Sequence, residues 1–504
     1  MTILTLLLED SIRQISVARG TLASDALRRA GLKADMPCGG QGRCGKCKVR
    51  ASGALSPLSQ AEGDLLTLEE IAGGIRLACC VRAEGDSAIT LPGSARSQIC
   101  LSGDMEPVAL RPRFTSCGAA VDIGTTTLAA RLYTPDGVLA AEASAVNPQS
   151  GWGADVISRI EASLRGQAAP LAECIRSAVD GLLRQMAGQA RISPDAIDGL
   201  VVTGNTAMLY LFTGTSPESL SHAPFQASRL FGECCPASRL GLHSAAPDAV
   251  VYLPRCMSAF VGADITTALL ASGLCREGET RLLVDIGTNG EMALRHQGKL
   301  YCCSTAAGPA FEGAGLSMGM RGQDGAVDHV VLRSGVLEPH VIGDGPPRGI
   351  CGSGAVDALA CLLEAGEMDE TGLLDADPSP IAPPVVLTQK DVRMIQLAKS
   401  AVSAGLRTLL HSVGVSCADV AELAVAGGFG SFLNGANAGR IGLLPEELVS
   451  KVRVLGNAAL SGAAMLLLDR ELAQSCENLA RNAETLTLSG SPAFSEYYME
   501  GMLF

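Results

Sequence analysis

The stretch Ala119-Ala-Val-Asp-Ile-Gly-Thr-Thr-Thr127 is a short apolar run that ends in an Asp-Ile-Gly-Thr turn. A second stretch of the same kind, Leu282-Leu-Val-Asp-Ile-Gly-Thr-Asn-Gly290, follows, and its aspartate lies 163 residues after that of the first. Short apolar runs bounded by turn residues predict buried strands. A single duplication at this distance indicates two similar α/β lobes rather than an array of short repeats.

The Asp-x-Gly-Thr turn has the chemistry that a phosphate site needs. A carboxylate at a strand end can hold hydrated Mg²⁺, and a glycine lets the backbone approach phosphate oxygens. We therefore expect Asp122 and Asp285 to position Mg²⁺ or the attacking water. The expected phosphate contacts come from the two turns, at Gly124, Thr125, Thr126, Gly287, Thr288 and Asn289. The chain has no Walker A sequence, so it is not a P-loop NTPase.

Two further glycine turns are candidates for the same site. Glu422-Leu-Ala-Val-Ala-Gly-Gly-Phe-Gly430 predicts a strand that ends in the pair Gly427-Gly428, against which a nucleotide base or sugar could lie. The alternative is a tight strand–helix turn without a ligand. Ile350-Cys-Gly-Ser-Gly354 is a second glycine turn for which both interpretations stay open.

Cysteine is unusually frequent, with 18 residues in a chain that lacks an export signal, so a disulfide framework is not expected. Cys38-Gly-Gly-Gln-Gly-Arg-Cys44-Gly-Lys-Cys47 has the spacing C-x5-C-x2-C, and Cys79 follows 32 residues later. Three thiols in one loop and a distant fourth favour a [2Fe–2S] cluster over structural zinc or free thiols. The loop glycines should adopt positive φ. Cys80 adjoins Cys79, and strand alternation would allow only one of them to be a ligand.

Composition and patterning give the organisation of the chain. A hydrophobic fraction of 47% with 18% charged residues excludes a disordered chain. We expect a ferredoxin-like unit over residues 1–92, a linker over 93–115, a first lobe over 116–276 and a second over 277–504. Within them, residues 2–8 and 12–17 predict a hairpin, 21–31 a helix, 48–51 and 88–91 strands, and 391–410 an amphipathic helix.

The charge and hydropathy of the chain indicate which partners and which location to expect. The net charge is −13, although residues 1–95 hold 11 basic and 10 acidic side chains. An acidic body argues against nucleic-acid binding. No apolar run is long enough to span a membrane and no signal peptide is recognised, so we expect a cytoplasmic protein without a membrane partner.

The residues quoted above carry two resemblances. Residues 1–92 resemble the plant- and vertebrate-type [2Fe–2S] ferredoxins, which have a β-grasp fold, and the x5 spacing is similar to adrenodoxin-type members. Their last ligand sits in a similar Leu-Ala-Cys segment, which favours Cys79 as the fourth ligand. The two phosphate turns and the glycine pair resemble those of the superfamily of actin, heat-shock chaperone ATPases and sugar kinases, which implies a duplicated ribonuclease-H-like ATPase with an adenosine loop at Gly427 and Gly428.

Further stretches make the resemblance more specific. They are Asn147-Pro-Gln149, Gly153-Ala-Asp155, Thr203–Met208, Val261-Gly-Ala-Asp264, Asn289-Gly-Glu291 and Ala307–Gly313. Behind an N-terminal ferredoxin, they resemble the RACo-type reductive activators of corrinoid-dependent methyltransferases. The link over 93–115 is shorter than in many relatives, and the C-terminal [4Fe–4S] segment of the archaeal activators is absent from the sequence.

The resemblance implies an ATP-hydrolysing activator that passes an electron through the [2Fe–2S] cluster to a Co(II) corrinoid protein. It further implies ATP and Mg²⁺ as cofactors, a reductase or ferredoxin as electron donor, and a homodimer. Two other functions stay open. The chain could be a small-molecule kinase of the same superfamily with a redox-sensing ferredoxin domain, or an electron carrier whose ATPase fold is a scaffold.

Overall fold

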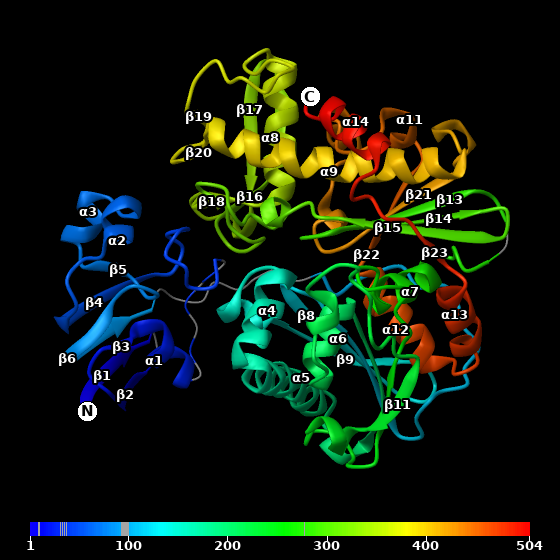
Figure 1. Ribbon diagram of the computed structural model, residues 1–504, viewed down its shortest axis with the longest axis horizontal. Coiled ribbons are helices and arrows are strands. Elements are labelled where there is room, and N and C mark those ends of the chain that lie inside the picture. Colours follow the sequence, from blue (N-terminus) through cyan, green and yellow to red (C-terminus); the bar gives the residue numbers. More distant parts are fainter. Residues whose placement is uncertain are drawn as a thin grey trace. The chain divides into compact units, whose positions relative to one another are not determined.

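The computed structural model describes residues 1–8, 11–30, 32, 34, 36, 38–91, 100–276 and 278–504. The chain forms two compact units (Figure 1). The first combines Met1–Arg96 with Pro148–Gln167, and the second combines Ser97–Asn147 with Ala168–Phe504. The second unit therefore contains the second predicted lobe and all of the first except Pro148–Gln167. The domain limits at residues 92, 115 and 276 stay predictions.

The first unit is built on a mixed sheet with the strand order β2-β1-β6-β4-β5, and β3 pairs with the start of β6, where Thr21 lies opposite Ala83. The predicted hairpin is confirmed, since β1 and β2 are antiparallel with Thr2 opposite Val17. The strands are β1 (Thr2–Leu7), β2 (Ile12–Val17), β3 (Thr21–Leu22), β4 (Lys48–Leu55), β5 (Ile75–Leu77) and β6 (Arg82–Thr90).

Alternation along β1 decides which face of this sheet is buried. Leu4 and Leu6 are fully buried, whereas Ile3, the residue before Leu4, is 47% exposed. Helix α1 (Ala23–Arg29) packs its apolar side, including Leu27, into the same core, which also contains Cys47. The cysteine loop between α1 and β4 is therefore anchored at its end by the core.

Two short helices, α2 (Gln60–Leu65) and α3 (Leu68–Ala72), were not predicted. Each begins at a capping box, in which the N-cap side chain and a glutamate three residues later satisfy each other's backbone N–H groups. The pairs are Ser59 with Glu62 and Thr67 with Glu70. This S/T-x-x-E pattern is a signal in the sequence that would have found both helices.

The second unit contains two six-stranded sheets that correspond in five strands, while the sixth strand differs, since β11 pairs with β12 and β23 pairs with β15. Their orders are β11-β12-β10-β7-β8-β9 and β22-β21-β13-β14-β15-β23. In each, three antiparallel strands (β7-β8-β9 or β13-β14-β15) continue into two parallel ones (β10 and β12, or β21 and β22). The predicted duplication is therefore confirmed. The first sheet consists of β7 (Cys117–Ile123), β8 (Thr127–Tyr133), β9 (Leu139–Val146), β10 (Ile197–Gly204), β11 (Glu233–Pro236) and β12 (Val250–Leu253). The second consists of β13 (Arg281–Ile286), β14 (Gly290–His296), β15 (Lys299–Thr305), β21 (Glu422–Ala426), β22 (Val452–Gly456) and β23 (Glu484–Thr485).

The lobes share one core because a late helix returns to the first sheet. Helix α12 (Ala458–Leu468) packs on α7 (Ala263–Ala271) and on β7 and β10. The contact is close at Gly462, where a Cβ atom would lie 1.8 Å from the Thr267 carbonyl oxygen. Only glycine allows this approach.

Helix α9 (Gln389–Val413) confirms the amphipathic helix predicted over 391–410 and lies along the second sheet, against β14 and β15 (Figure 1). It begins at Thr388, which forms a capping box with Asp391. The predicted apolar face is buried, namely Val392, Ile395, Ala398, Val402, Leu406 and Leu409, but Lys399 is buried among them. The Lys399 ammonium donates to the carbonyls of Gly501 and Leu503, which explains how a charged group is held there.

The remaining elements surround these sheets. The helices are α4 (Val156–Ala162), α5 (Ala168–Ala190), α6 (Thr206–Thr213), α8 (Gly352–Ala365), α10 (Gly435–Arg440), α11 (Glu446–Val449), α13 (Leu472–Arg481) and α14 (Pro492–Glu500). The small sheets contain β16 (Ala326–Arg333), β17 (Val336–Val341), β18 (Gly349–Ile350), β19 (Ser379–Ala382) and β20 (Val385–Leu387). Among the described helices, none is both long and apolar enough to cross a membrane.

The described part of the predicted linker is bound to the second unit. Gly103 forms a β-bridge with Gly456, and the Asp104 N–H donates to the Leu455 carbonyl. The Asn457 N–H in turn donates to the Ser102 carbonyl at 3.0 Å. Residues 93–99 of the linker lie outside the described residues, as does residue 92 at the end of the ferredoxin-like unit. From Ser102 onward the segment is therefore part of the second unit's edge rather than a tether.

Candidate cluster and nucleotide sites

The predicted cluster ligands come together in two pairs. The Sγ atoms of Cys38 and Cys44 are 3.3 Å apart, and those of Cys47 and Cys79 are also 3.3 Å apart. All 18 cysteines, each within the described ranges, are free thiols, as expected. Within those ranges no group of three or more Cys, His, Asp or Glu residues is arranged around a single metal ion. Thiols gathered two by two fit a two-iron cluster, which takes four thiolates.

The loop that carries three of these thiols has the backbone that its glycines predict. Gly39, Gly40, Gly42 and Gly45 have φ angles between +64° and +83°. This region is open to glycine and unfavourable for most other residues. The loop therefore curls tightly enough for Cys38, Cys44 and Cys47 to face a common site.

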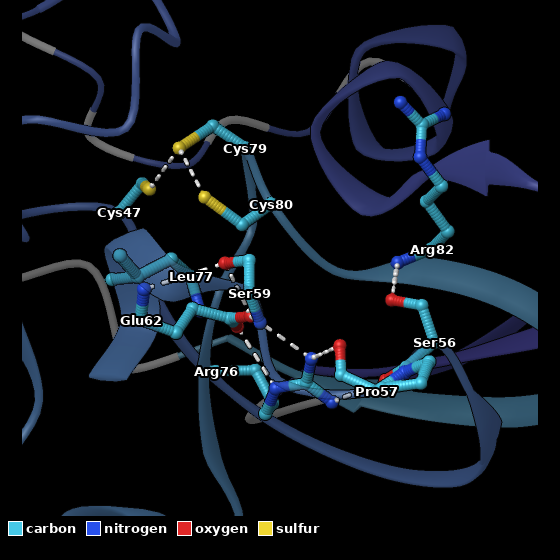
Figure 2. Close-up of polar contacts among 10 residues, drawn as sticks. All are labelled: Cys47, Ser56, Pro57, Ser59, Glu62, Arg76, Leu77, Cys79, Cys80 and Arg82. Atoms are coloured by element: carbon cyan, nitrogen blue, oxygen red, sulfur yellow. Dashed lines mark hydrogen bonds and ion pairs between the residues drawn. The ribbon is translucent and has the colours of Figure 1, made fainter. Parts of the chain in front are cut away.

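The Sγ atom of Cys80 lies 3.6 Å from that of Cys79 (Figure 2). The expectation that strand alternation separates the two thiols is wrong, because the chain turns here. The N–H groups of Cys80 and Val81 both donate to the Leu77 carbonyl, at 2.8 and 2.9 Å. The contact with Cys47 involves Cys79, which supports Cys79 as the fourth ligand.

Hydrogen bonds within the pairs prepare the thiols for metal binding. The Cys44 thiol donates to Cys38 and lowers the pKa of Cys38, and the hydrogen bond that Cys47 forms with Cys79 lowers the pKa of Cys47. In each pair burial opposes the effect. One thiol of each pair is thus shifted toward the thiolate, which is the form that binds metal.

A buried ion pair lies beneath the segment that bears Cys79 (Figure 2). Glu62 is fully buried and accepts bonds from Arg76 at 2.8 and 3.0 Å. It also accepts from the Leu77 N–H at 3.0 Å. Burial alone would raise the pKa of Glu62, but these hydrogen bonds, with those from Ser59, outweigh it and lower the pKa. The carboxylate therefore stays ionised and fixes Leu77 two residues before Cys79.

The second unit contains a cavity at the facing ends of its two sheets. The cavity is lined by every residue predicted for the nucleotide site, namely Asp122, Gly124, Thr125, Thr126, Asp285, Gly287, Thr288, Asn289, Gly427 and Gly428. Asp122 and Asp285 are the last residues but one of the equivalent strands β7 and β13. The equivalent turns of the two lobes thus meet in one place, as the duplication predicts.

Close packing joins the glycine pair to the second phosphate turn. Gly427 has φ +94°, and a Cβ atom there would lie 2.5 Å from Asp285 Oδ1. Asp285 is directly opposite Ala426 in the parallel pairing of β13 and β21. Gly427 is therefore required by the packing of this turn, whether or not a nucleotide lies against it, whereas a Cβ atom at Gly428 would meet nothing within 4 Å.

Side chains from neighbouring elements fix the first phosphate turn. The Asn147 amide donates to the Gly124 carbonyl at 2.7 Å, and the Asn205 amide donates to the Thr125 hydroxyl at 3.0 Å. The Asn457 amide donates to Asp122 at 3.1 Å. The backbone N–H of Asn457 also donates to the Ser102 carbonyl, so Asn457 connects Asp122 to the predicted linker. Cys100 of this linker lines the cavity.

Five carboxyl groups line the cavity. Burial raises the pKa of Asp122 to about 7 and that of Asp285 to about 6, and Glu312 contributes to the second shift. Burial and the charges of neighbouring aspartates also raise the pKa values of Asp264 and Glu291. Carboxyl groups that crowd one cavity resist ionisation, and a bound cation would relieve this cost. Their chemistry therefore fits Mg²⁺.

Glu312 links the two phosphate turns. Its carboxylate accepts hydrogen bonds from the hydroxyls of Thr126 and Thr288, the latter at 2.7 Å. The preceding Phe311 stacks on Phe429, with ring centroids 4.7 Å apart. Phe429 directly follows the glycine pair, so the turn around Glu312 contacts all three predicted loops.

The structure also places residues whose role the sequence did not indicate. Asp264, Glu291 and Glu312 lie within quoted stretches, but no role was predicted for them. Cys351, Gly352 and Ser353 line the cavity at the start of α8, so this glycine turn does belong to the site. The N-terminus of this 14-residue helix is suited to an anion.

Comparisons with known proteins assign both parts of the chain to domain families. The model of the 2Fe-2S iron-sulfur cluster binding domain matches residues 7–84, the RACo middle region matches 117–277, and the C-terminal ASKHA domain of RACo matches 279–504. The corrinoid activation enzyme RamQ of Eubacterium limosum is 32% identical over an alignment 599 positions long, which covers 100% of this chain and 99% of the relative. The chain belongs to the RACo family.

Two other relatives extend the comparison of this RACo protein. The [Co(II) methylated amine-specific corrinoid protein] reductase of Methanosarcina barkeri is 26% identical over 349 residues, or 63% of this chain and 64% of the relative. The solved structure of a reductive activator for corrinoid, iron-sulfur protein has 27% identity and a TM-score of 0.71. That match covers 99% of this chain and 98% of the other. The predicted fold, a ferredoxin domain followed by a duplicated ASKHA domain, is confirmed.

Proposed function

We propose that this RACo protein is an ATP-dependent reductive activator that transfers an electron through a [2Fe–2S] cluster to a Co(II) corrinoid protein and so restores Co(I). The observation that carries the proposal is the end-to-end similarity to a corrinoid activation enzyme. Two sites on the same chain support it. One gathers thiols in pairs, and the other combines two phosphate turns with buried carboxyl groups.

In the first unit, Cys38, Cys44, Cys47 and Cys79 would hold the cluster, which supplies one-electron transfer when bound. The glycine loop excludes bulky side chains from its surroundings. The Glu62–Arg76 pair keeps the segment before Cys79 in place. The electron donor would be a reductase or a ferredoxin.

In the second unit, Asp122 and Asp285 would position Mg²⁺ or the attacking water. The hydroxyls of Thr125, Thr126 and Thr288, together with Asn289, would bind phosphate oxygens. Gly427 and Gly428 would contact the adenosine. Since the residues come from both lobes, a nucleotide that binds all of them stabilises one relative position of the lobes. That preference is how ATP could bias the complex with the corrinoid protein.

Binding of the corrinoid protein would complete the reaction. In the complex, this chain would change the axial ligation of the cobalt in the corrinoid protein. Because axial ligands tune the electronics of a bound metal, that change would make the uphill reduction possible. The proposal includes a cytoplasmic location and a homodimer.

The test mixes the full-length protein, loaded with its cluster, with a Co(II) corrinoid protein. The chemical reductant is kept at a level that leaves the corrinoid protein as Co(II) on its own. We expect the Co(I) absorption to appear with ATP and Mg²⁺ and not with ADP or without nucleotide. The same Co(I) yield in all arms would contradict the ATP dependence. Phosphorylation of an added small molecule, without a corrinoid requirement, would indicate a kinase instead.

A further inference from the structure

A fifth thiol lies at the cluster site beside the four proposed ligands. Cys80 is only partly buried, and its Sγ atom is 3.6 Å from the Cys79 Sγ atom (Figure 2). This separation is close to the 3.3 Å between Cys79 and Cys47. Cys80 is therefore near enough to the site to compete for the same iron.

The glycine loop provides a second, independent observation. A Cβ atom built on Gly42 would lie 3.4 Å from the Cys80 Sγ atom. Gly42 is between Cys38 and Cys44, so the Cys80 thiol lies against the loop that carries the other ligands. The thiol thus faces the cluster loop and the fourth ligand at the same time.

The turn that carries the two thiols holds them on one side. Leu77 accepts hydrogen bonds from the N–H groups of Cys80 and Val81, and its own N–H is bound by Glu62. Rotation of a cysteine between staggered χ1 positions moves its sulfur by about 3 Å, without movement of the backbone. Exchange of one thiol for the other therefore needs only side-chain rotation on a fixed turn.

We propose that Cys80 is a reserve ligand that takes the position of Cys79 when Cys79 cannot bind iron. This inference rests on the proposed function, in which the site holds a [2Fe–2S] cluster. In the exchange, the Cys80 thiol loses its proton to solvent and forms the iron–sulfur bond that Cys79 would otherwise make. No electron is gained or lost.

The experiment compares full-length Cys79→Ser, Cys80→Ser and the double variant after anaerobic reconstitution with iron and sulfide. We expect Cys80→Ser to match the wild type. Cys79→Ser should keep the wild-type iron content and an all-thiolate visible and EPR spectrum. The double variant should bind about fivefold less iron or show the shifted spectrum of an oxygen ligand. Equal iron content and spectra in Cys79→Ser and the double variant would overturn the proposal.

Cys44→Ser is the matched control. Cys38, itself a proposed ligand, is the described thiol that contacts Cys44, so no spare thiol is available there. This variant should behave like the double variant. If the wild type itself binds no cluster, the proposed function fails, which is a different result from failure of the reserve ligand alone.

Alkylation of the loaded protein gives a second measurement, and its wild-type arm does not depend on variant folding. In the loaded wild type, iodoacetamide should modify Cys80 and spare Cys79, as read by mass spectrometry. In loaded Cys79→Ser, Cys80 should become protected. Protection of Cys80 from the outset, with Cys79 modified, would reverse the assignment of the two thiols and overturn the proposal.

Discussion

The Glu312 carboxylate accepts a hydrogen bond from the Thr288 hydroxyl at 2.7 Å, and it also accepts one from Thr126. One side chain therefore joins equivalent turns of the two lobes. Its charge also raises the pKa of Asp285. Glu312 is thus a positioning residue for the proposed ATP reaction.

Replacement of Glu312 by glutamine should test this role. We expect kcat for ATP hydrolysis to fall by about 10- to 100-fold, because the two threonines lose a common acceptor, while nucleotide affinity changes less. Loss of the neighbouring charge should lower the pKa of Asp285, so the acidic limb of the pH–rate profile should move to lower pH. Glu338→Gln, on exposed β17, is the control. An unchanged rate and profile would contradict the role.

Asp285→Ala should remove ATP hydrolysis, by about 100-fold or more, because the variant lacks the carboxylate proposed to position Mg²⁺ or water. The cluster belongs to the other compact unit, so its visible spectrum should be unchanged. Phosphate release and absorption spectra measure the two effects separately. Loss of the cluster spectrum in this variant would show that the sites are not independent.

Cys44→Ser should have the reverse effect. The variant should lose its normal cluster and the reduction of the corrinoid protein, while it still binds and hydrolyses ATP. Iron analysis and phosphate release on the same preparation check this prediction. Failure to bind ATP would mean that the thiol loop is needed for the fold of the whole chain.

The raised pKa values of Asp122, about 7, and Asp285, about 6, predict a pH dependence of Mg²⁺ binding. The ionised carboxylates bind the cation, so Mg²⁺-dependent nucleotide affinity should increase by about tenfold between pH 5.5 and 8. Titration with a fluorescent nucleotide measures it, and Asp122→Asn should flatten the profile. Equal affinity at both pH values would contradict the prediction.

In the protein without nucleotide, the same two groups should make the folded state less stable as the pH rises, whereas the nucleotide affinity increases. Their pKa values are raised on folding, so the folded state binds more protons than the unfolded state, and their contribution is lost as pH rises through about 6 to 7. Asp122→Asn should therefore raise the melting temperature by a few degrees at pH 8 and by less at pH 5.5.

Arg76→Met tests the buried ion pair of the first unit. The variant leaves the fully buried Glu62 carboxylate without its partner, which should cost about 3–5 kcal/mol. The rate of loss of the cluster absorbance at 37 °C should increase accordingly. Lys48→Met, at the more exposed Lys48–Glu70 pair, is the control and should cost at most about 1 kcal/mol. Equal effects of the two variants would contradict the assigned importance of burial.

Local patterns in the sequence predicted much of the site. The repeated Asp-Ile-Gly-Thr turns identified equivalent strand ends, and Gly39 to Gly45 predicted a positive-φ loop, because both features depend on a few neighbouring residues. The buried face of α9 followed from the helical spacing of its apolar residues.

Contacts between distant segments could not be predicted in this way. The return of α12 to the first sheet, the burial of Lys399 under the carbonyls of Gly501 and Leu503, and the bridge from Glu312 all join residues far apart in the chain. Nothing in their local sequence specifies the partner. The Cys79–Cys80 turn was missed for a different reason, since strand alternation was assumed to continue through the two cysteines.

The Glu62–Arg76 pair also bears on how fast an electron can enter or leave the neighbouring thiol site. A one-electron change alters the local charge, and mobile dipoles around it would have to reorient. Here both partners are buried, and Arg76 is also bound to the carbonyls of Ser56 and Pro57 at 3.1 Å. Dipoles that are already fixed add no reorganisation at the moment of reaction. This side of the site therefore contributes little to the reorganisation energy of electron transfer.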